Sequence, residues 1–186
     1  MYKSKDEKEL VRLCGLKDAR AAEELYRRYA ARVYSLCRRY LRDNDAARDV
    51  MHDAFIHALE KIDSFHYSEE GSLYKWISTI AINMSLSYIV RHQRKMISLD
   101  SWQDDICEEL SEDNIIEVPR EKLMEWVAAL PDWKRVIFNL YYIENYTHKE
   151  IAEMLNISEK GSASALAKAR KQLKDIIKKD LEEMQQ

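Results

Sequence analysis

Three ionisable side chains on one predicted helix could do chemistry together: His52, Asp53 and His57. Histidine and aspartate are common metal ligands, and a bound metal ion can activate water for hydrolysis. Two ligands on one helix face require a spacing of three or four residues, whereas His52 and His57 are five residues apart and diverge. No distant His/Asp cluster completes a ligand shell, and the sequence has no glycine-rich phosphate loop and no G-x-S-x-G motif. We therefore expect no catalytic residue, no metal site and no cofactor, and we expect that the protein is not an enzyme.

A second pattern, NYTHKEIAEMLNIS near the C-terminus, is typical of a helix-turn-helix. Thr147 is the expected N-cap of the first helix, with Glu150 three residues later in a capping box. Ala152 supplies the small residue that lets two helices cross closely, and Asn156 tolerates the left-handed backbone of the turn. Ser158 is the expected cap of the following helix, whose first two turns would then face the major groove of DNA.

That following helix begins with EKGSASAL and therefore carries mainly small residues. Its projection at about 100° per residue predicts which side faces outward. Opposite the inward Leu166 and Leu173 lie Lys160, Gly161, Ser164, Lys168 and Lys171. Lysine can bind phosphates, a serine hydroxyl can contact base edges, and small residues allow a close approach to the groove. The same residues also suit the solvent side of a packing helix, so the local pattern leaves both interpretations open.

Apolar residues at spacings of three and four predict helices along most of the chain. The sequence has only three glycines and two prolines, which favours an all-α fold over one with strands and tight turns. The expected helices run from Asp18 to Arg42, from an N-cap at Asp45 to about Ile62, from a cap at Ser72 to about Lys95, from Arg120 to Leu130, from Pro131 to about Tyr141, and through the helix-turn-helix.

The long helix after Ser72 has two apolar faces. The expected core stripe consists of Leu73, Trp76, Ile77, Ile80 and Met84. A second set lies largely off this stripe: Tyr74, Ile82, Leu86 and Ile89. We expect another surface of the protein, or a partner, to cover the second set.

Charge is distributed unevenly along the 186 residues, which are enough for one domain or two small ones. The net charge is −3, but Asp100 to Glu117 holds eight acidic residues and no basic ones. From Lys160 to Lys179 there are seven basic residues and one acidic residue. A cationic face toward phosphates is therefore compatible with the acidic total. The acidic stretch and the following Pro119 predict a linker between two domains.

The expected location is the cytoplasm. No apolar run approaches the ~18 residues of a membrane-spanning helix, and the N-terminal MYKSKDEKEL lacks the apolar core of a signal peptide. The cysteines Cys14, Cys37 and Cys107 form no C-x-x-C pair and are expected to be free thiols.

Four blocks of the sequence together resemble the extracytoplasmic-function (ECF) sigma factors, the compact two-domain members of the bacterial sigma-70 family. In chain order they are AAEELYRRYAARVYSLCRRYL, DAARDVMHDAFIHALEKIDSF, GSLYKWISTIAINMSLSYIVRHQRK and LPDWKRVIFNLYYIENYTHKEIAEMLNIS, the last followed by LAKARKQL. The resemblance covers nearly the whole chain outside the acidic linker. It implies a sigma region 2 domain over residues 1–97, the linker over 98–119 and a region 4 domain over 120–186.

The resemblance also implies partners and the residues that meet them. Core RNA polymerase would bind through its β′ clamp helices and β flap, and an anti-sigma factor is implied by family habit. Residues implied at the polymerase are Asp49, His52, Asp53, Phe55 and Ile56. Those implied at the promoter −10 element, where the loop from Ser64 to Gly71 would capture a flipped base, are Ser64, Phe65, His66, Tyr74, Lys75, Asn83, Arg91, Arg94 and Lys95. Those implied at the −35 element are Thr147, His148, Ser158, Lys160, Gly161, Ser162, Ser164, Ala165, Lys168 and Lys171.

The −35 helix departs from the family pattern SEGTVKSRLxRAR, because this chain has SEKGSASALAKAR. Gly161 stands where Thr is common, Ala163 where Lys or Arg is usual, and Ala165 where Arg or Gln is usual. Recognition is then expected to depend on a few lysines and Ser164, on groove shape and on tethering through polymerase. Two other hypotheses are a helix-turn-helix regulator that acts without polymerase and a helical adaptor that does not contact DNA.

Overall fold

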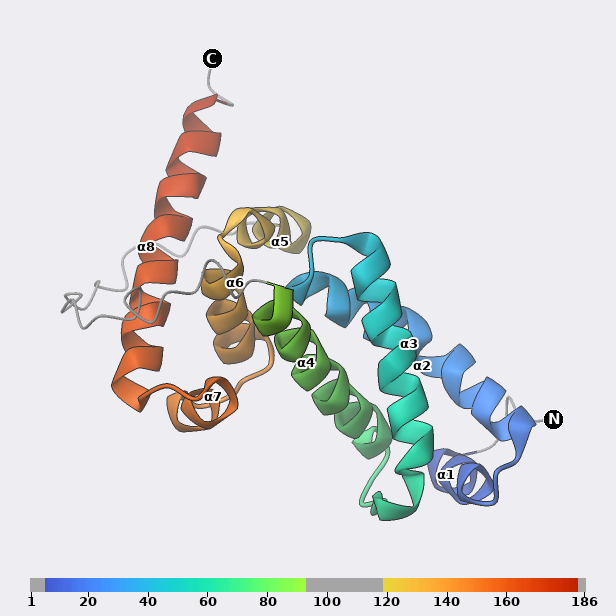
Figure 1. Cartoon of the computed structure of the whole chain (residues 1–186). Coiled ribbons are helices and arrows are strands. Elements are labelled where there is room, and N and C mark those ends of the chain that lie inside the picture. The colour runs from blue at the N-terminus through green and yellow to red at the C-terminus, as the bar shows by residue number, and fades with distance from the viewer. Residues whose placement is uncertain (1–5, 93–118, 184–186) are drawn as a thin grey trace. The chain divides into compact units, whose positions relative to one another are not determined.

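The structure is a computed structural model that describes residues 6–92 and 119–183 of the chain (Figure 1). The chain divides into two compact units, Met1–Arg94 and Lys95–Gln186. The described residues form helices and no strand, so the all-α prediction is confirmed for this part of the chain. Arg94, Lys95, Cys107 and the predicted linker up to residue 118 lie outside the described residues.

Over residues 6–92, the first unit is a bundle of four α-helices with one 3-10 turn. Its elements are α1 (Glu7–Gly15), α2 (Ala19–Tyr40), α3 (Asn44–Glu60), the 3-10 helix η2 (Ile62–Ser64) and α4 (Ser72–His92). Helices α2, α3 and α4 pack on one another, and α1 packs on α2 and η2. Helix α1 was not predicted from the sequence. Its cap Asp6 accepts a hydrogen bond from the Glu9 N–H at 2.7 Å, and Leu10 is fully buried.

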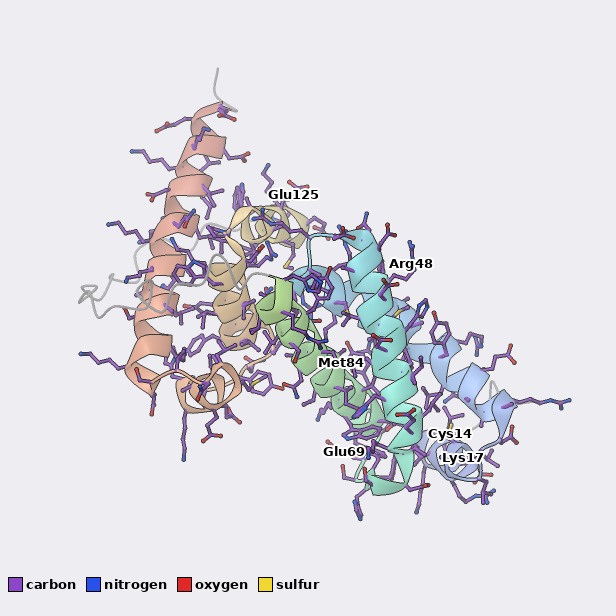
Figure 2. The ribbon with its side chains drawn as sticks, viewed as in Figure 1. Cys14, Lys17, Arg48, Glu69, Met84 and Glu125 are labelled. Atoms are coloured by element: carbon purple, nitrogen blue, oxygen red, sulfur yellow. The ribbon has the colours of Figure 1, made fainter. Side chains whose placement is uncertain are left out.

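Helix α4 is covered on two sides, because α2 and α3 both pack against it. Leu73 and Ile77 are buried as predicted. The rest of the predicted stripe is wrong: the other buried apolar residues are Ala81, Ile82, Leu86 and Ile89, whereas Trp76, Ile80 and Met84 are half-buried. Figure 2 labels Met84 on α4 and Glu69 in the loop that precedes the helix. The half-buried residues therefore border the solvent rather than fill the core.

Two predicted helix caps in the first unit are wrong. Asp43, not Asp45, caps α3, because its Oδ1 accepts hydrogen bonds from the N–H groups of Asp45 at 2.7 Å and Ala46 at 3.0 Å. Ser72 is the first residue of α4 rather than its cap. The N–H groups of Gly71, just before α4, and of Leu73, in its first turn, donate instead to a carboxylate from a distant part of the chain, the side chain of Glu7.

The second unit gathers three shorter helices around one long helix. Its elements are α5 (Arg120–Ala129), α6 (Asp132–Phe138), the π-helix η4 (Asn139–Ile143), α7 (His148–Leu155) and α8 (Glu159–Glu183). Helices α5, α6 and α7 all pack on α8. One core cluster joins Trp126, Leu130, Phe138 and Leu173. Arg135 is 3% exposed and ties α6 to the end of α5, since it donates to the Leu130 carbonyl at 3.3 Å and to Asp132 at 2.7 Å.

The π turn η4 interrupts the helix predicted to run from Pro131 to Tyr141. The Asn139 carbonyl accepts a hydrogen bond from the Glu144 N–H at 3.0 Å, five residues later rather than four. This extra residue widens the turn. The ring of Tyr141 then lies 4.7 Å from His148, and the ring of Tyr142 lies 4.8 Å from Phe138.

Candidate functional site

One face of α3 presents four of the five predicted polymerase-binding side chains to solvent. Asp49, His52, Asp53 and Ile56 are exposed, and Ile56 is 57% exposed. Phe55 is 3% exposed, so its burial contradicts a direct contact with a partner. The positions of the exposed residues repeat with the period of an α-helix, which places two carboxylates, a histidine and an isoleucine on one face.

Tyr26 of α2 extends this face and was missed by the sequence analysis. Its hydroxyl lies 3.0 Å from His52 Nε2, and its ring lies 5.0 Å from the ring of Phe55. The buried ring of Phe55 thus packs against the ring of Tyr26. Tyr26 is 38% exposed. The sequence signal that could have identified Tyr26 is its position outside the apolar stripe of α2.

The loop from Ser64 to Gly71 is held to the first unit by backbone and aromatic contacts. Ser64 donates from Oγ to the Lys61 carbonyl at 2.7 Å, and His66 Nδ1 lies 3.1 Å from the Ser64 carbonyl. The half-buried rings of Phe65 and Trp76 lie 5.0 Å apart. Ser64 and His66 remain exposed. The loop therefore exposes polar side chains next to a packed pair of aromatic rings.

Predicted −10 residues on α4 lie in different environments. Lys75, Asn83 and Arg91 are exposed, and Lys75 pairs with Glu69 of the loop at 3.3 Å. Tyr74 is half-buried, and the Arg32 guanidinium lies 3.7 Å from the centre of its ring. One face of Tyr74 is therefore already occupied by a cation. Arg94 and Lys95 lie outside the described residues, so the structure does not place them.

The helix-turn-helix has the predicted local geometry. Thr147 and Glu150 form a capping box, in which the Thr147 N–H donates to Glu150 Oε2 at 2.8 Å. Hydrogen bonds from the Thr147 backbone and hydroxyl lower the pKa of Glu150. Asn156 has a left-handed backbone with φ 53°. Ser158 caps α8, since its Oγ accepts from the Gly161 N–H at 2.9 Å. The structure therefore confirms the predicted N-cap at Thr147, its capping box with Glu150, the left-handed turn at Asn156 and the cap at Ser158.

His148 links the two helices of the motif. Its Nδ1 lies 3.0 Å from Ser162 Oγ on α8, and its ring stacks on Tyr141. Burial lowers the pKa of His148, which favours the neutral ring. Ser162 is fully buried. This contact therefore holds α7 against α8, and the burial of Ser162 contradicts its predicted contact with DNA.

Two further −35 predictions are contradicted by burial. Ala165 is 3% exposed and lies in the core beside Leu166. Gly161 is buried, and a Cβ atom at this position would lie 3.0 Å from Ser158 Oγ. The glycine therefore makes room for the cap at the start of α8. The exposed residues on the first turns are instead Ser158, Glu159, Lys160 and Ala163, with Ser164 and Lys168 half-buried.

A basic hollow of about 470 Å³ lies between α6 and α8. Its lysines are Lys134, Lys168, Lys171 and Lys179, and Asp175 contributes the one carboxylate of the lining. Burial, and then the charge of Lys168, lower the pKa of Lys134. Lys134 was missed because it lies 34 residues before Lys168 and joins the lysines of α8 only in the fold.

Neither a membrane span nor a metal cluster emerges from the described residues. Over residues 6–92 and 119–183, no helix is both long and apolar enough to cross a membrane. Within the same ranges, no three His, Cys, Asp or Glu side chains come together as a set of metal ligands.

Comparisons with known protein families match both units. Residues 25–95 match the family model of Sigma-70 region 2, and residues 120–173 match that of Sigma-70, region 4. Over 160 residues the chain is 28% identical to the ECF RNA polymerase sigma factor SigM of Bacillus subtilis, covering 83% of this chain and 93% of the relative. Over 164 residues it is 28% identical to SigW of the same organism, covering 80% and 86%.

Two solved structures have the same fold at low sequence identity. CnrH, in complex with the cytosolic domain of CnrY, matches with a TM-score of 0.52 and 17% identity over 94% of this chain and 98% of that chain. The sigma factor RpoE from Bartonella quintana, in complex with the anti-sigma factor NepR, matches with a TM-score of 0.52 and 16% identity over 84% and 96%. Both agree with the all-helical architecture described above.

Proposed function

The chain belongs to the ECF sigma factors of the sigma-70 family, which recognise promoters together with RNA polymerase, and we propose how its surfaces divide this work. The observation that carries the proposal is the order of the surfaces. An exposed α3 face and a polar loop lie in the region 2 part, and a helix-turn-helix with basic side chains lies in the region 4 part. The protein catalyses no reaction itself and acts in the cytoplasm, where polymerase works.

The α3 face binds core polymerase. We define this face as Tyr26, Asp49, His52, Asp53 and Ile56. The exposed Ile56 side chain and the exposed part of the Tyr26 ring are apolar surface that water solvates poorly, which favours burial at an interface. The carboxylates of Asp49 and Asp53 on the same face would steer the approach toward a basic surface on the partner.

The loop from Ser64 to Gly71, with Asn83 on α4, engages the melted −10 strand. Base flipping costs a few kcal/mol of unstacking and unpairing, which a pocket for the extruded base offsets. Exposed polar groups at Ser64 and His66 can hydrogen-bond to a base edge, and the paired rings of Phe65 and Trp76 provide apolar surface for stacking. Lys75 and Arg91 would bind nearby phosphates.

The start of α8 reads the −35 element with few long side chains. Ser158, Lys160 and Ser164 lie at the base edges, and Thr147 and His148 support the approach from α7. Lys168 and Lys171 bind the phosphate backbone, and Lys134 joins them because it lines the same basic hollow. Sequence preference at this element therefore comes mainly from groove shape and from contacts of the small side chains.

An anti-sigma factor regulates the protein. One structure with the same fold contains a sigma factor bound to an anti-sigma factor, another contains CnrH bound to the cytosolic domain of CnrY, and these partners belong to those proteins. The exposed α3 face would be occupied by polymerase in the active state. We propose that the anti-sigma factor competes for this same face.

Reconstitution with core polymerase tests the whole proposal. Core polymerase and this chain should together give promoter-dependent transcripts, and mapping their start sites would yield the promoter sequence. Ile56→Ser should weaken core binding by at least tenfold, because the change removes the apolar centre of the face. Leu16→Ser is the matched control, since Leu16 is 67% exposed but lies at the end of α1. Specific binding to duplex DNA without polymerase, and no transcripts with it, would contradict the proposal.

The −35 assignment has its own test. Lys168→Ala should weaken initiation from −35-dependent promoters and reduce the salt dependence of DNA binding by about one counterion. Lys178→Ala is the control, because Lys178 is an exposed lysine on the distal half of the same helix. Equal effects of the two changes would contradict this placement of α8.

A further inference from the structure

Helix α1 contacts both ends of the loop that precedes α4. At the first end, α1 packs on η2 (Ile62–Ser64), and the backbone of Gly15 comes so close that an added Cβ would lie 3.0 Å from Asp63 Oδ1. At the second end, Glu7 reaches Gly71 and Leu73. Figure 2 labels Cys14 on α1 and Lys17 in the turn that follows this helix. A short helix near residue 10 thus braces a loop more than fifty residues away in sequence.

The Glu7 carboxylate is the acceptor at the start of α4. It accepts hydrogen bonds from the Gly71 N–H at 3.1 Å, the Leu73 N–H at 3.0 Å and the Ser72 hydroxyl at 3.4 Å. Glu7 is 1% exposed. Free N–H groups at a helix start need acceptors, and a negative charge there is favoured by the helix dipole. Glu7 therefore does the work of an N-cap from a different helix.

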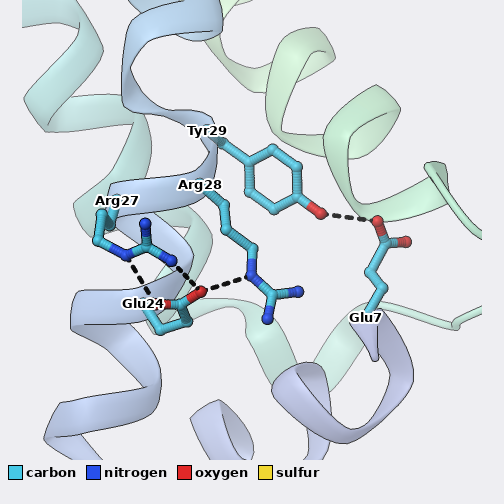
Figure 3. Close-up of polar contacts among 5 residues, drawn as sticks. All are labelled: Glu7, Glu24, Arg27, Arg28 and Tyr29. Atoms are coloured by element: carbon cyan, nitrogen blue, oxygen red, sulfur yellow. Dashed lines mark hydrogen bonds and ion pairs between the residues drawn. The ribbon is translucent and has the colours of Figure 1, made fainter. Parts of the chain in front are cut away.

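A third helix fixes the same carboxylate. The Tyr29 hydroxyl on α2 donates to Glu7 Oε2 at 2.8 Å (Figure 3). Burial and this hydrogen bond raise the pKa of Tyr29, so the hydroxyl keeps its proton and remains a donor. Gly71 has φ +89°, a conformation that favours glycine, and its N–H lies against Glu7. The position of the carboxylate, and with it the end of the loop, is thus determined from α1, α2 and α4 together.

We propose that Glu7 is a positioning residue for −10 recognition, which holds the loop from Ser64 to Gly71 in the conformation that receives the flipped base. The inference rests on the proposed function of this loop and assigns the recognition geometry to an element outside the matched region 2 segment, which begins at residue 25. A loop ordered before binding loses less conformational entropy when the base enters. Removing the brace therefore weakens base capture without touching any group that contacts DNA.

The test compares DNA that carries a base with DNA that lacks it. A premelted promoter, chosen from the mapped start sites, is made with an abasic site at each −10 position in turn. Wild-type holoenzyme should bind the intact strand more tightly than the abasic strand at the captured position. Glu7→Gln should reduce this ratio by about tenfold, the scale of losing a cap, with the abasic affinity and core binding unchanged. A change that only lowered the folded fraction would weaken both strands equally and leave the ratio intact.

Two further variants sharpen the test. Glu9→Gln is the matched control, because Glu9 lies on the same helix and pairs with Arg12 of that helix at 2.8 Å. Tyr29→Phe removes one donor from Glu7 and should reduce the ratio by about two- to fivefold, which provides a readout if Glu7→Gln does not fold. An unchanged ratio in both Glu7→Gln and Tyr29→Phe would overturn the inference while the loop assignment stands. Absence of any base preference in the wild type would overturn the loop assignment and the inference together.

Discussion

The start of α4 in the first unit and the starts of α7 and α8 in the second unit are capped by different means. In the second unit, α7 and α8 are capped by neighbours in sequence: Thr147 with Glu150, and Ser158. In the first unit, α4 receives its acceptor from Glu7, 64 residues before Gly71. A local cap forms with its helix, whereas a remote cap requires the folded unit around it. The start of α4 is therefore coupled to α1 and α2, and the starts of α7 and α8 depend on a few adjacent residues.

The largest expected effect comes from the remote cap. Glu7→Ala should lower the free energy of unfolding of the first unit by about 2–4 kcal/mol, since several buried donors lose their acceptor at once. Hydrogen exchange of the full chain, followed by mass spectrometry, would show faster exchange in α1 and at the start of α4. The second unit should be unchanged. Faster exchange throughout both units would contradict the prediction that the Glu7 cap stabilises the first unit alone.

The next largest effect is expected from substitutions at two residues with positive φ, one in each unit. Gly71→Ala should cost about 1–2 kcal/mol in the first unit, because alanine is strained at φ +89° although no atom lies within 4 Å of the added Cβ. Asn156→Gly in the second unit is the counterpart. It should change stability by only a few tenths of a kcal/mol, because glycine adopts the left-handed conformation at least as readily as asparagine. Urea unfolding of each variant measures both values, and a cost for Asn156→Gly equal to that of Gly71→Ala would contradict the prediction.

The local cap gives a smaller effect. Thr147→Ala should lower the stability of the second unit by about 1 kcal/mol, through loss of the acceptor for the Glu150 N–H. Faster hydrogen exchange should be confined to the first turn of α7. Thr79→Ala is a control, since Thr79 is an exposed threonine within α4 rather than at its start. Faster exchange in α4 of Thr147→Ala would contradict the local nature of this cap.

The smallest expected effect is on the pH dependence of stability, which should differ between the two units in mild acid. Burial lowers the pKa of His148, so its contribution is complete above its ordinary pKa of ~6.5 and is lost as the pH falls below that value. In the first unit, hydrogen bonds from Arg27 and Arg28 lower the pKa of Glu24 to about 2 (Figure 3). That contribution is complete above pH ~4.5 and is lost only as the pH falls toward 2.

The second unit should therefore weaken slightly between pH 7 and pH 5.5, and this pH dependence should disappear in His148→Gln. Hydrogen exchange at fixed pH values, corrected for intrinsic rates, would measure it. If the stability of the second unit still decreased between pH 7 and pH 5.5 in His148→Gln, another titrating group would be responsible.

Local features of the sequence predicted the second unit well. The capping box at Thr147, the turn at Asn156 and the cap at Ser158 each depend on residues within a few positions of one another. The first unit was harder, because α4 packs on two helices and is apolar on most of its surface. Its periodicity therefore did not show which of Trp76 and Ile82 is buried. Glu7 gave no local signal for its contact with α4.

The site predictions failed where helix rotation mattered. Family positions identified the start of α8 but not which of its small residues face inward, so Gly161, Ser162 and Ala165 were wrongly placed at DNA. Tyr26 and Lys134 were missed for the complementary reason. Each joins its surface only through contacts between helices that are distant in sequence.

The π turn at Asn139–Ile143 has a consequence for changes in chain length. It holds one residue more than an α-helical turn, and each residue of a helix corresponds to about 100° of rotation. Deleting one residue here would leave α6, α7 and α8 chemically intact but would swing the helix-turn-helix around the axis of α6. The stacking of Tyr141 on His148 would be lost, and Lys160 would face a different direction. Promoter preference in the second unit is therefore more vulnerable to a single insertion or deletion in this turn than to most substitutions on its surface.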